Sequence, residues 1–227
     1  MSDDLVLNRY AQKALRNLMQ VFFDFERQPS RTWFVKKIDK NSLTAEDYCI
    51  FLKNLHSQVI EGSRWISRCA SSFDSEFAEV RSLIIKHAKD EHRDYMMLES
   101  DYINCGGKSE ELLFCMRNIG SDALHGFIMY RASRSNPYDL LGAMWIIEGL
   151  GQKMASDWAD QIESLLDMQI PVTRFLKYHG ENDAEHLKKF YEMLNILCVS
   201  DSRAERIQQT AEVVARLYAL QIEEMCP

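Results

Sequence analysis

The sequence predicts an all-α protein, and three observations lead to this class. Helical periodicity of apolar residues is nearly continuous along the 227 residues, and only four prolines interrupt it. Strand signals are almost absent, with neither an Asn-Gly nor an Asp-Gly hairpin turn. No low-complexity segment or long linker divides the chain. We therefore predict one domain over residues 1–227, built as a single-domain seven-helix bundle.

The predicted helices follow from the breaks in this periodicity. Gln28-Pro29-Ser30 ends the first helix, Gly106-Gly107 ends the third, and Pro137 and Pro171 mark two later joints. Residues 32–41 are expected to form an irregular connection, and residues 109–132 to form shorter helical pieces. The expected long helices are Leu5–Phe25, a helix from a cap near Thr44 to Cys69, Ser75–Asn104, Tyr138 to near Met168, a helix carrying His179, and Asp201–Glu224.

Charge and cysteine usage narrow the function classes. The formal net charge is −7 and no block of Lys or Arg stands out, so nucleic acid and anionic membranes are not expected as partners. No apolar run approaches the roughly 20 residues that span a bilayer, and the acidic N-terminus lacks the apolar core of a signal peptide. The six cysteines show no metal-like spacing, which favours reduced thiols and a cytoplasmic location.

The segment FLKYHGENDAEH carries the strongest functional pattern. His179, Asp183 and His186 are spaced by four and three residues, which places them on one face of a helix. Two imidazoles and a carboxylate on one face commonly hold a first-row transition metal. This pattern predicts a metal site, and the remaining ligands must come from other helices.

Two other segments offer such ligands. Glu148 lies among apolar neighbours in LLGAMWIIEGLG, where a carboxylate needs a proton, a cationic partner or a metal; a structural ion pair is the alternative interpretation. In HAKDEHRDYMMLESDY, His87, Glu91 and Asp94 share one helical face, and the alternative there is a solvated, charge-rich surface. Four carboxylates would balance the charge of two divalent ions. A donor set of imidazole nitrogens and carboxylate oxygens suits iron or manganese, whereas a structural zinc site usually has fewer oxygens and some thiolate.

These three segments resemble the heme-oxygenase-like diiron oxidase and oxygenase superfamily. HAKDEHRDYMMLESDYINCGG is similar to the H-A-x-x-E-x-x-H helix of that family, LLGAMWIIEGLGQKM to its helix with a single buried Glu, and FLKYHGENDAEH to its H-x3-D-x2-H helix. The matching blocks cover roughly residues 80–190 in the family's order. The resemblance implies a heme-oxygenase-like fold, shared with thiaminase II and pyrroloquinoline quinone synthase, and a homodimer.

The resemblance implies catalytic and metal-binding roles for five residues in particular: Glu91, Glu148, His179, Asp183 and His186. Asp94 stands where the family pattern usually has histidine, and we include it as a sixth metal ligand because aspartate also binds iron. His87 is the substitute ligand, whereas His92 points about 100° away from Glu91 on a regular helix. The implied cofactor is two Fe²⁺ per chain, with one iron or manganese as alternatives.

The function that follows is a non-heme iron oxidoreductase that uses O₂ to oxidise a small-molecule substrate. Tyr130, Trp145 and Tyr178 are candidates for the pocket lining, although aromatic residues more often fill cores. Two alternatives are a cofactorless oxidase like pyrroloquinoline quinone synthase and a metal-free small-ligand-binding protein. Heme binding is weakly supported because no histidine precedes His56, and thiaminase-like hydrolysis lacks a clearly activated cysteine.

Overall fold

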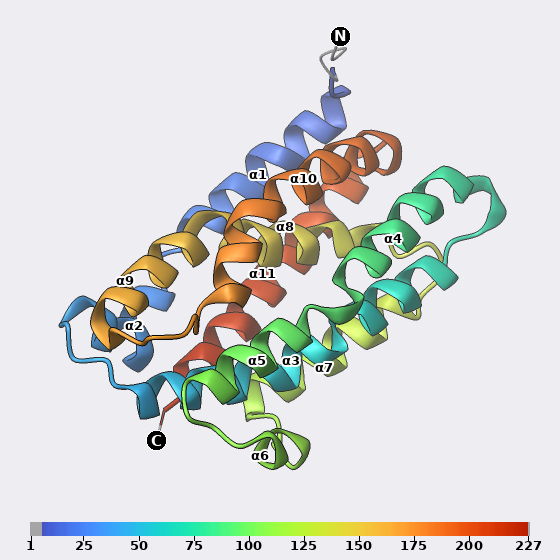
Figure 1. Ribbon diagram of the computed structural model, residues 1–227. Helices are drawn as coiled ribbons and strands as arrows, with labels where there is room; N and C mark the ends of the chain where they lie inside the picture. Colours follow the sequence, from blue (N-terminus) through green and yellow to red (C-terminus); the bar gives the residue numbers. More distant parts are fainter. Residues whose placement is uncertain (1–5, 227) are drawn as a thin grey trace, which may run out of the picture.

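The computed structural model describes residues 6–226, apart from the side chains of residues 182–185. Helices account for the regular structure of this described part, which confirms the all-α prediction (Figure 1). The α-helices are α1 (Arg9–Phe25), α2 (Trp33–Asp39), α3 (Ala45–Ser71), α4 (Ala78–Asp90), α5 (Tyr95–Asn104), α6 (Ser109–Leu113), α7 (Ile119–Ala132), α8 (Leu141–Leu150), α9 (Ser156–Leu166), α10 (Arg174–Leu197) and α11 (Asp201–Glu223).

The described residues thus form eleven α-helical segments, and the predicted number of seven was wrong. Two of the long predicted helices are interrupted: a 3₁₀ turn at Glu91–Arg93 separates α4 from α5, and a π-helix at Gly151–Ala155 separates α8 from α9. Helix α2 forms within the segment expected to be irregular, because Phe34, Val35 and Ile38 bury one face of a short amphipathic turn.

Two helix starts are fixed by side chains that cap backbone N–H groups. Asn8 Oδ1 accepts hydrogen bonds from the backbone of Tyr10 and Ala11, at 2.9 and 3.0 Å, so α1 begins at Arg9. The predicted start at Leu5 lies outside the described residues. Thr44 and Asp47 form a reciprocal capping box at the start of α3, in the segment where the sequence predicts a cap.

The long helices pack as two groups that meet along the middle of the molecule. Helix α3 packs against α4, α5 and α7, whereas α11 packs against α1, α7 and α8, and α10 against α8 and α9 (Figure 1). The buried apolar residues form two clusters, one centred on α1, α8 and α11 and the other on α2, α3 and α9. Within the described residues, no helix is both long and apolar enough to cross a membrane.

Helix α10 is capped by a carboxylate from a different helix. Thr173 precedes α10 but makes no side-chain capping bond. Instead Asp101 of α5, which is 0% exposed, accepts a hydrogen bond from the backbone N–H of Phe175 at 2.8 Å. A carboxylate at a helix N-terminus satisfies an otherwise unpaired N–H group and interacts favourably with the helix dipole. Asp101 therefore fixes the start of α10 against α5.

We predict that Asp101→Ala lowers the free energy of unfolding by about 1–2 kcal/mol, because it removes this cap and leaves a buried N–H group unpaired. Chemical denaturation followed by circular dichroism would measure the change. The matched control is Asp160→Ala, which removes an exposed carboxylate from α9 and should change stability by less than about 0.5 kcal/mol. Equal effects of the two substitutions would contradict a capping role for Asp101.

Candidate metal centre

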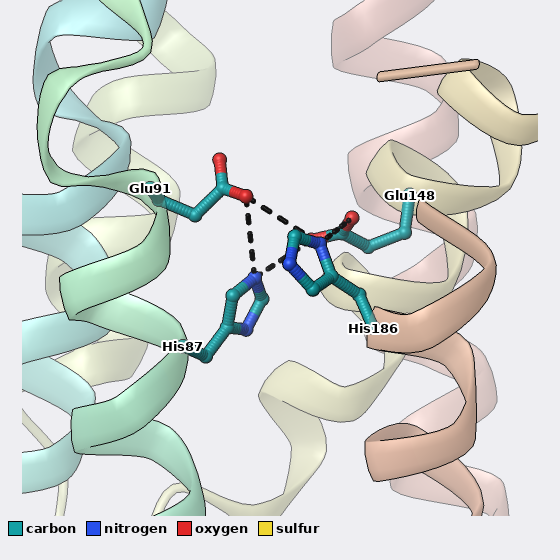
Figure 2. Close-up of side chains that lie close together, drawn as sticks. All are labelled: His87, Glu91, Glu148 and His186. Atoms are coloured by element: carbon teal, nitrogen blue, oxygen red, sulfur yellow. Dashed lines mark hydrogen bonds and ion pairs between the residues drawn. The ribbon is translucent and has the colours of Figure 1, made fainter. Parts of the chain in front are cut away.

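Four titratable side chains from separate helical segments meet in the interior between α4, α8 and α10. His87 comes from α4, Glu91 from the 3₁₀ turn that follows it, Glu148 from α8 and His186 from α10 (Figure 2). All four point toward one another, and one ligand atom from each lies within 4.8 Å of the others. The structure thus brings together residues up to 99 positions apart in sequence, His87 and His186 being the outermost.

Glu148 is the residue that both imidazoles contact. Its Oε1 is 3.0 Å from His87 Nε2, and its Oε2 is hydrogen-bonded to His186 Nδ1 at 2.9 Å. The two imidazole rings lie 4.5 Å apart, measured between their centroids. Glu148 is only 7% exposed, so this carboxylate is compensated almost wholly by the two histidines.

Glu91 joins this group to a second one. Its Oε1 is 3.4 Å from His186 Nδ1 and 3.8 Å from His87 Nε2. Glu91 also lies within 4.8 Å of ligand atoms of Asp94 and His179, and Asp94 Oδ2 is 3.5 Å from His179 Nε2. Two groups of potential ligands therefore share one carboxylate, an arrangement that suits a residue bridging two cations.

The carboxylates of the centre differ in their affinity for protons. Burial and the nearby charge of Glu148 raise the pKa of Glu91 to about 8, against the opposing effect of His179 and His186. Burial also raises the pKa of Asp94. For Glu148, burial is opposed by hydrogen bonding to His186 and His87, and the pKa falls well below its ordinary value. Without a metal, the raised pKa of Glu91 therefore favours the protonated form of that carboxyl at neutral pH.

The donor set fits a hard or borderline divalent cation. Glu91 Oε1 and Asp94 Oδ2 are buried and have no hydrogen-bond partner. Buried polar atoms of this kind usually have a partner, so these two call for a ligand. Carboxylate oxygens combined with imidazole nitrogens are the donors that iron and manganese accept, and a bound cation would displace the proton that Glu91 retains because of its raised pKa.

The structure brings five of the six predicted metal-ligand residues together, namely Glu91, Asp94, Glu148, His179 and His186, with His87 beside them. The side chain of Asp183 lies outside the described residues. His92 is exposed and does not belong to either group, in agreement with its helical phase.

The prediction that three aromatic residues line the pocket was wrong. Tyr130 is 59% exposed, Trp145 donates its indole N–H to the carbonyl of Leu18, and Tyr178 packs against His179; none lines the cavity described below. Their helical periodicity could not distinguish a cavity wall from ordinary packing.

A close helix crossing positions the histidine-bearing part of α10. A Cβ atom on Gly180 would collide with Ser156 Oγ and lie 3.0 Å from the backbone nitrogen of Ser156. The crossing falls where the π-helix Gly151–Ala155 passes into α9. A π-helical turn often occurs at a functional site, and here it follows Glu148 by three residues. On the other side of the centre, Lys189 Nζ bonds Asp90 Oδ2 at 2.8 Å and ties α10 to α4.

An apolar cavity of about 200 Å³ opens onto the centre and runs between the two buried clusters. His87, Glu91, Glu148 and His179 contribute to its wall. One face of α3 supplies much of the remainder, from Phe51 to Cys69, a length of roughly 27 Å at 1.5 Å per residue. Sequence analysis missed this wall, because the same apolar stripe predicts a packed helix face.

Comparison with known proteins is consistent with this architecture. Residues 68–219 match the model of a family described as iron-containing redox enzymes. No curated protein matches the chain significantly in sequence.

Several solved structures share the fold. A Shewanella denitrificans OS217 domain of unknown function with a heme oxygenase-like fold superposes with a TM-score of 0.82 at 18% identity, over 91% of this chain and 89% of that one. A TenA homologue from Pseudomonas syringae pv. tomato has a TM-score of 0.73 at 10% identity, over 96% and 93% of the two chains. A TenA homologue from P. horikoshii OT3 has a TM-score of 0.69 at 14% identity, over 97% and 98%. These likenesses confirm the predicted heme-oxygenase-like fold.

We predict that Gly180→Val destabilises the protein by about 1–3 kcal/mol, because the larger side chain forces α10 away from Ser156. Thermal and chemical denaturation would measure the loss. Gly126→Val is the matched control, since Gly126 is an exposed residue of α7 where a Cβ meets nothing within 4 Å, and the effect should stay within about 0.5 kcal/mol. A Gly180→Val protein as stable as the control would show that the close crossing is dispensable.

Proposed function

Because the chain belongs to the family of iron-containing redox enzymes, we propose that it is a non-heme iron oxidase or oxygenase acting with O₂ on a small apolar molecule. The observation that supports this most directly is a cluster of buried carboxylates and imidazoles in the wall of an apolar cavity. A purely structural ion-pair network would not need a cavity beside it.

Two metal positions follow from the two groups of ligands. His87, Glu91, Glu148 and His186 would hold one ion, and Glu91, Asp94 and His179 a second ion, with Glu91 common to both. Ferrous iron bound there would supply the electrons and the O₂-binding position that side chains alone lack. Asp94 stands where the resemblance predicts histidine. It would give the second ion a negatively charged oxygen donor in place of a neutral nitrogen.

The protein's own contribution is to hold and shield this centre. His87 and His186 orient the Glu148 carboxylate from opposite oxygens, so neither oxygen can turn away from the centre. The apolar wall excludes water from the reacting region and accepts an apolar substrate. Among the described residues that line the cavity, none is Lys or Arg. We therefore propose that the part of the substrate lying in the cavity carries no negative charge.

Cysteine-dependent hydrolysis, as in a thiaminase, is less well supported. Cys69 is the one cysteine among the described residues that line the cavity, and burial raises its pKa to about 12. A thiol with a raised pKa is a poor nucleophile at neutral pH. Cys105 and Cys115, the candidates near helix ends, do not line the cavity. The metal-free alternatives are a cofactorless oxidase and a small-ligand-binding protein, and metal analysis separates them from the iron enzyme.

We predict that anaerobic loading with Fe²⁺ gives about two iron ions per chain, and that the loaded protein consumes O₂. Glu148→Gln and His186→Ala should each lower the bound iron to about one ion per chain, because each removes a donor or the neutralising charge from one of the two groups of ligands and leaves the other group intact. Elemental analysis after gel filtration and an oxygen electrode would provide the two measurements.

The matched control for these variants is His92→Ala, which removes an exposed imidazole next to Glu91 in sequence and should retain full iron content. Helicity of every variant is checked by circular dichroism, so that loss of iron is not confused with unfolding. If the wild-type protein binds no iron, or if Glu148→Gln and His186→Ala bind as much as wild type, the iron enzyme is rejected and the metal-free functions remain.

The cavity has open space beside Gly62 that a larger side chain could fill. Gly62 on α3 lines it, and a Cβ at this position meets nothing within 4 Å, so Gly62→Leu would place a side chain in the open space. We expect the affinity for N-phenylnaphthylamine, an uncharged apolar fluorophore, to fall by about tenfold or more while iron content is unchanged. Fluorescence titration measures the affinity, and Gly126→Leu on α7 is the control. Equal binding by wild type and Gly62→Leu would place the ligand elsewhere.

A further inference from the structure

A pair of thiols lies outside the candidate metal centre. Cys49 is near the start of α3, and Cys105 is the residue that ends α5. Each thiol reaches the backbone of the helix that carries the other: Cys49 Sγ is 4.0 Å from the carbonyl oxygen of Tyr102, and Cys105 Sγ is 3.3 Å from that of Ala45. Both sulfur atoms therefore lie in the contact between α3 and α5.

The two thiols differ in accessibility and acidity. Cys49 is half-buried, whereas Cys105 is 5% exposed. The neighbouring Cys105 thiol lowers the pKa of Cys49 against the opposing effect of burial, and the backbone N–H of Gly107 also lowers it, although Glu111 and Glu46 act in the other direction. The interaction with Cys49, together with burial, raises the pKa of Cys105. An accessible, more acidic thiol beside a buried one is the usual arrangement of a redox-sensitive cysteine with its resolving partner.

We propose that Cys49 and Cys105 form a reversible redox site whose oxidant is hydrogen peroxide and whose product is an intramolecular disulfide. The Cys49 thiolate attacks one peroxide oxygen, the O–O bond breaks, and the departing hydroxide takes up a proton to become water. The resulting sulfenic acid is neutral, so the Cys49 thiolate no longer raises the pKa of Cys105. Cys105 sulfur then attacks the sulfenic sulfur, the S–O bond breaks, and a second water leaves with the Cys105 proton. Two thiols are oxidised by two electrons, and one peroxide is reduced to two waters.

The disulfide would join two elements that frame the metal centre. Helix α3 supplies the cavity wall from Phe51 onward, two residues beyond Cys49. Asp101 lies one helical turn before Cys105 and holds the start of α10. A covalent link between α3 and α5 would restrict the separation of these elements and stabilise the folded chain. The proposal does not depend on the proposed oxidase activity, because peroxide is supplied from outside.

The test uses the full-length reduced protein without added metal. One equivalent of hydrogen peroxide is added, free thiols are alkylated, and the protein is digested without reductant for mass spectrometry. We expect a peptide linked through Cys49 and Cys105, loss of two titratable thiols per chain, and full recovery of both with dithiothreitol. The oxidised protein should melt about 5 °C or more above the reduced one.

Three variants complete the experiment. Cys49→Ser and Cys105→Ser should each abolish the linked peptide and the rise in melting temperature, whereas Cys226→Ser, which removes an exposed thiol, should retain both. The assignment in the wild-type protein does not depend on how the variants fold. A link through Cys115 or Cys226, or irreversible oxidation of Cys49 with Cys105 still reduced, would overturn the proposal.

Discussion

The interaction on which the centre depends is the contact of one buried carboxylate, Glu148, with two imidazoles from different helices. Burying an unpaired carboxylate costs several kcal/mol. His87 and His186 remove most of that cost by contacting opposite oxygens at 3.0 and 2.9 Å. Because these histidines come from α4 and α10, the same contacts fix the two helices around α8. The polar interior is therefore part of the fold as well as a potential site.

Glu91 and Asp94 show the opposite balance. Each has a buried oxygen without a hydrogen-bond partner, and burial raises the pKa of both carboxyl groups. A chain that needed only stability would gain from apolar residues of similar volume at these positions. Here Glu91 and Asp94 lack full compensation, whereas Glu148 beside them has it. This arrangement is expected when the missing partner of Glu91 and Asp94 is a cation supplied from solution.

The sequence predicted the parts of this structure that depend on local periodicity. Helical faces placed His179 and His186 together and kept His92 apart, and the apolar neighbours of Glu148 indicated its burial. Capping residues also marked the start of α3, because a capping box involves residues only three positions apart.

What the sequence could not predict depends on contacts between distant segments. The 3₁₀ turn at Glu91–Arg93 and the π-helix at Gly151–Ala155 are departures from regular geometry that leave no periodic signal. In the sequence, Gly180 indicates only a residue that weakens a helix. Its role in the close helix crossing depends on Ser156, which lies against it in the structure. The Asp101 cap joins residues 74 positions apart.

Under the proposed function, the cavity wall would limit how a small-molecule substrate is selected. Apolar contacts distinguish molecules weakly, at about 1–3 kcal/mol for each methylene, whereas a buried hydrogen-bonding group rejects an unmatched ligand far more strongly. Of the described residues lining the cavity, Gln58 is the one amide; it is 4% exposed, and it accepts a hydrogen bond from Gln221 of α11. Trp65 also lines the wall, but its N–H group is bonded to His125. Away from the ligand cluster, the side chains of the wall that carry hydrogen-bonding groups also include Tyr138 and Tyr218. Under the proposed function, sharp selection would fall to these few polar groups, and the apolar rest of the wall would select by shape and length.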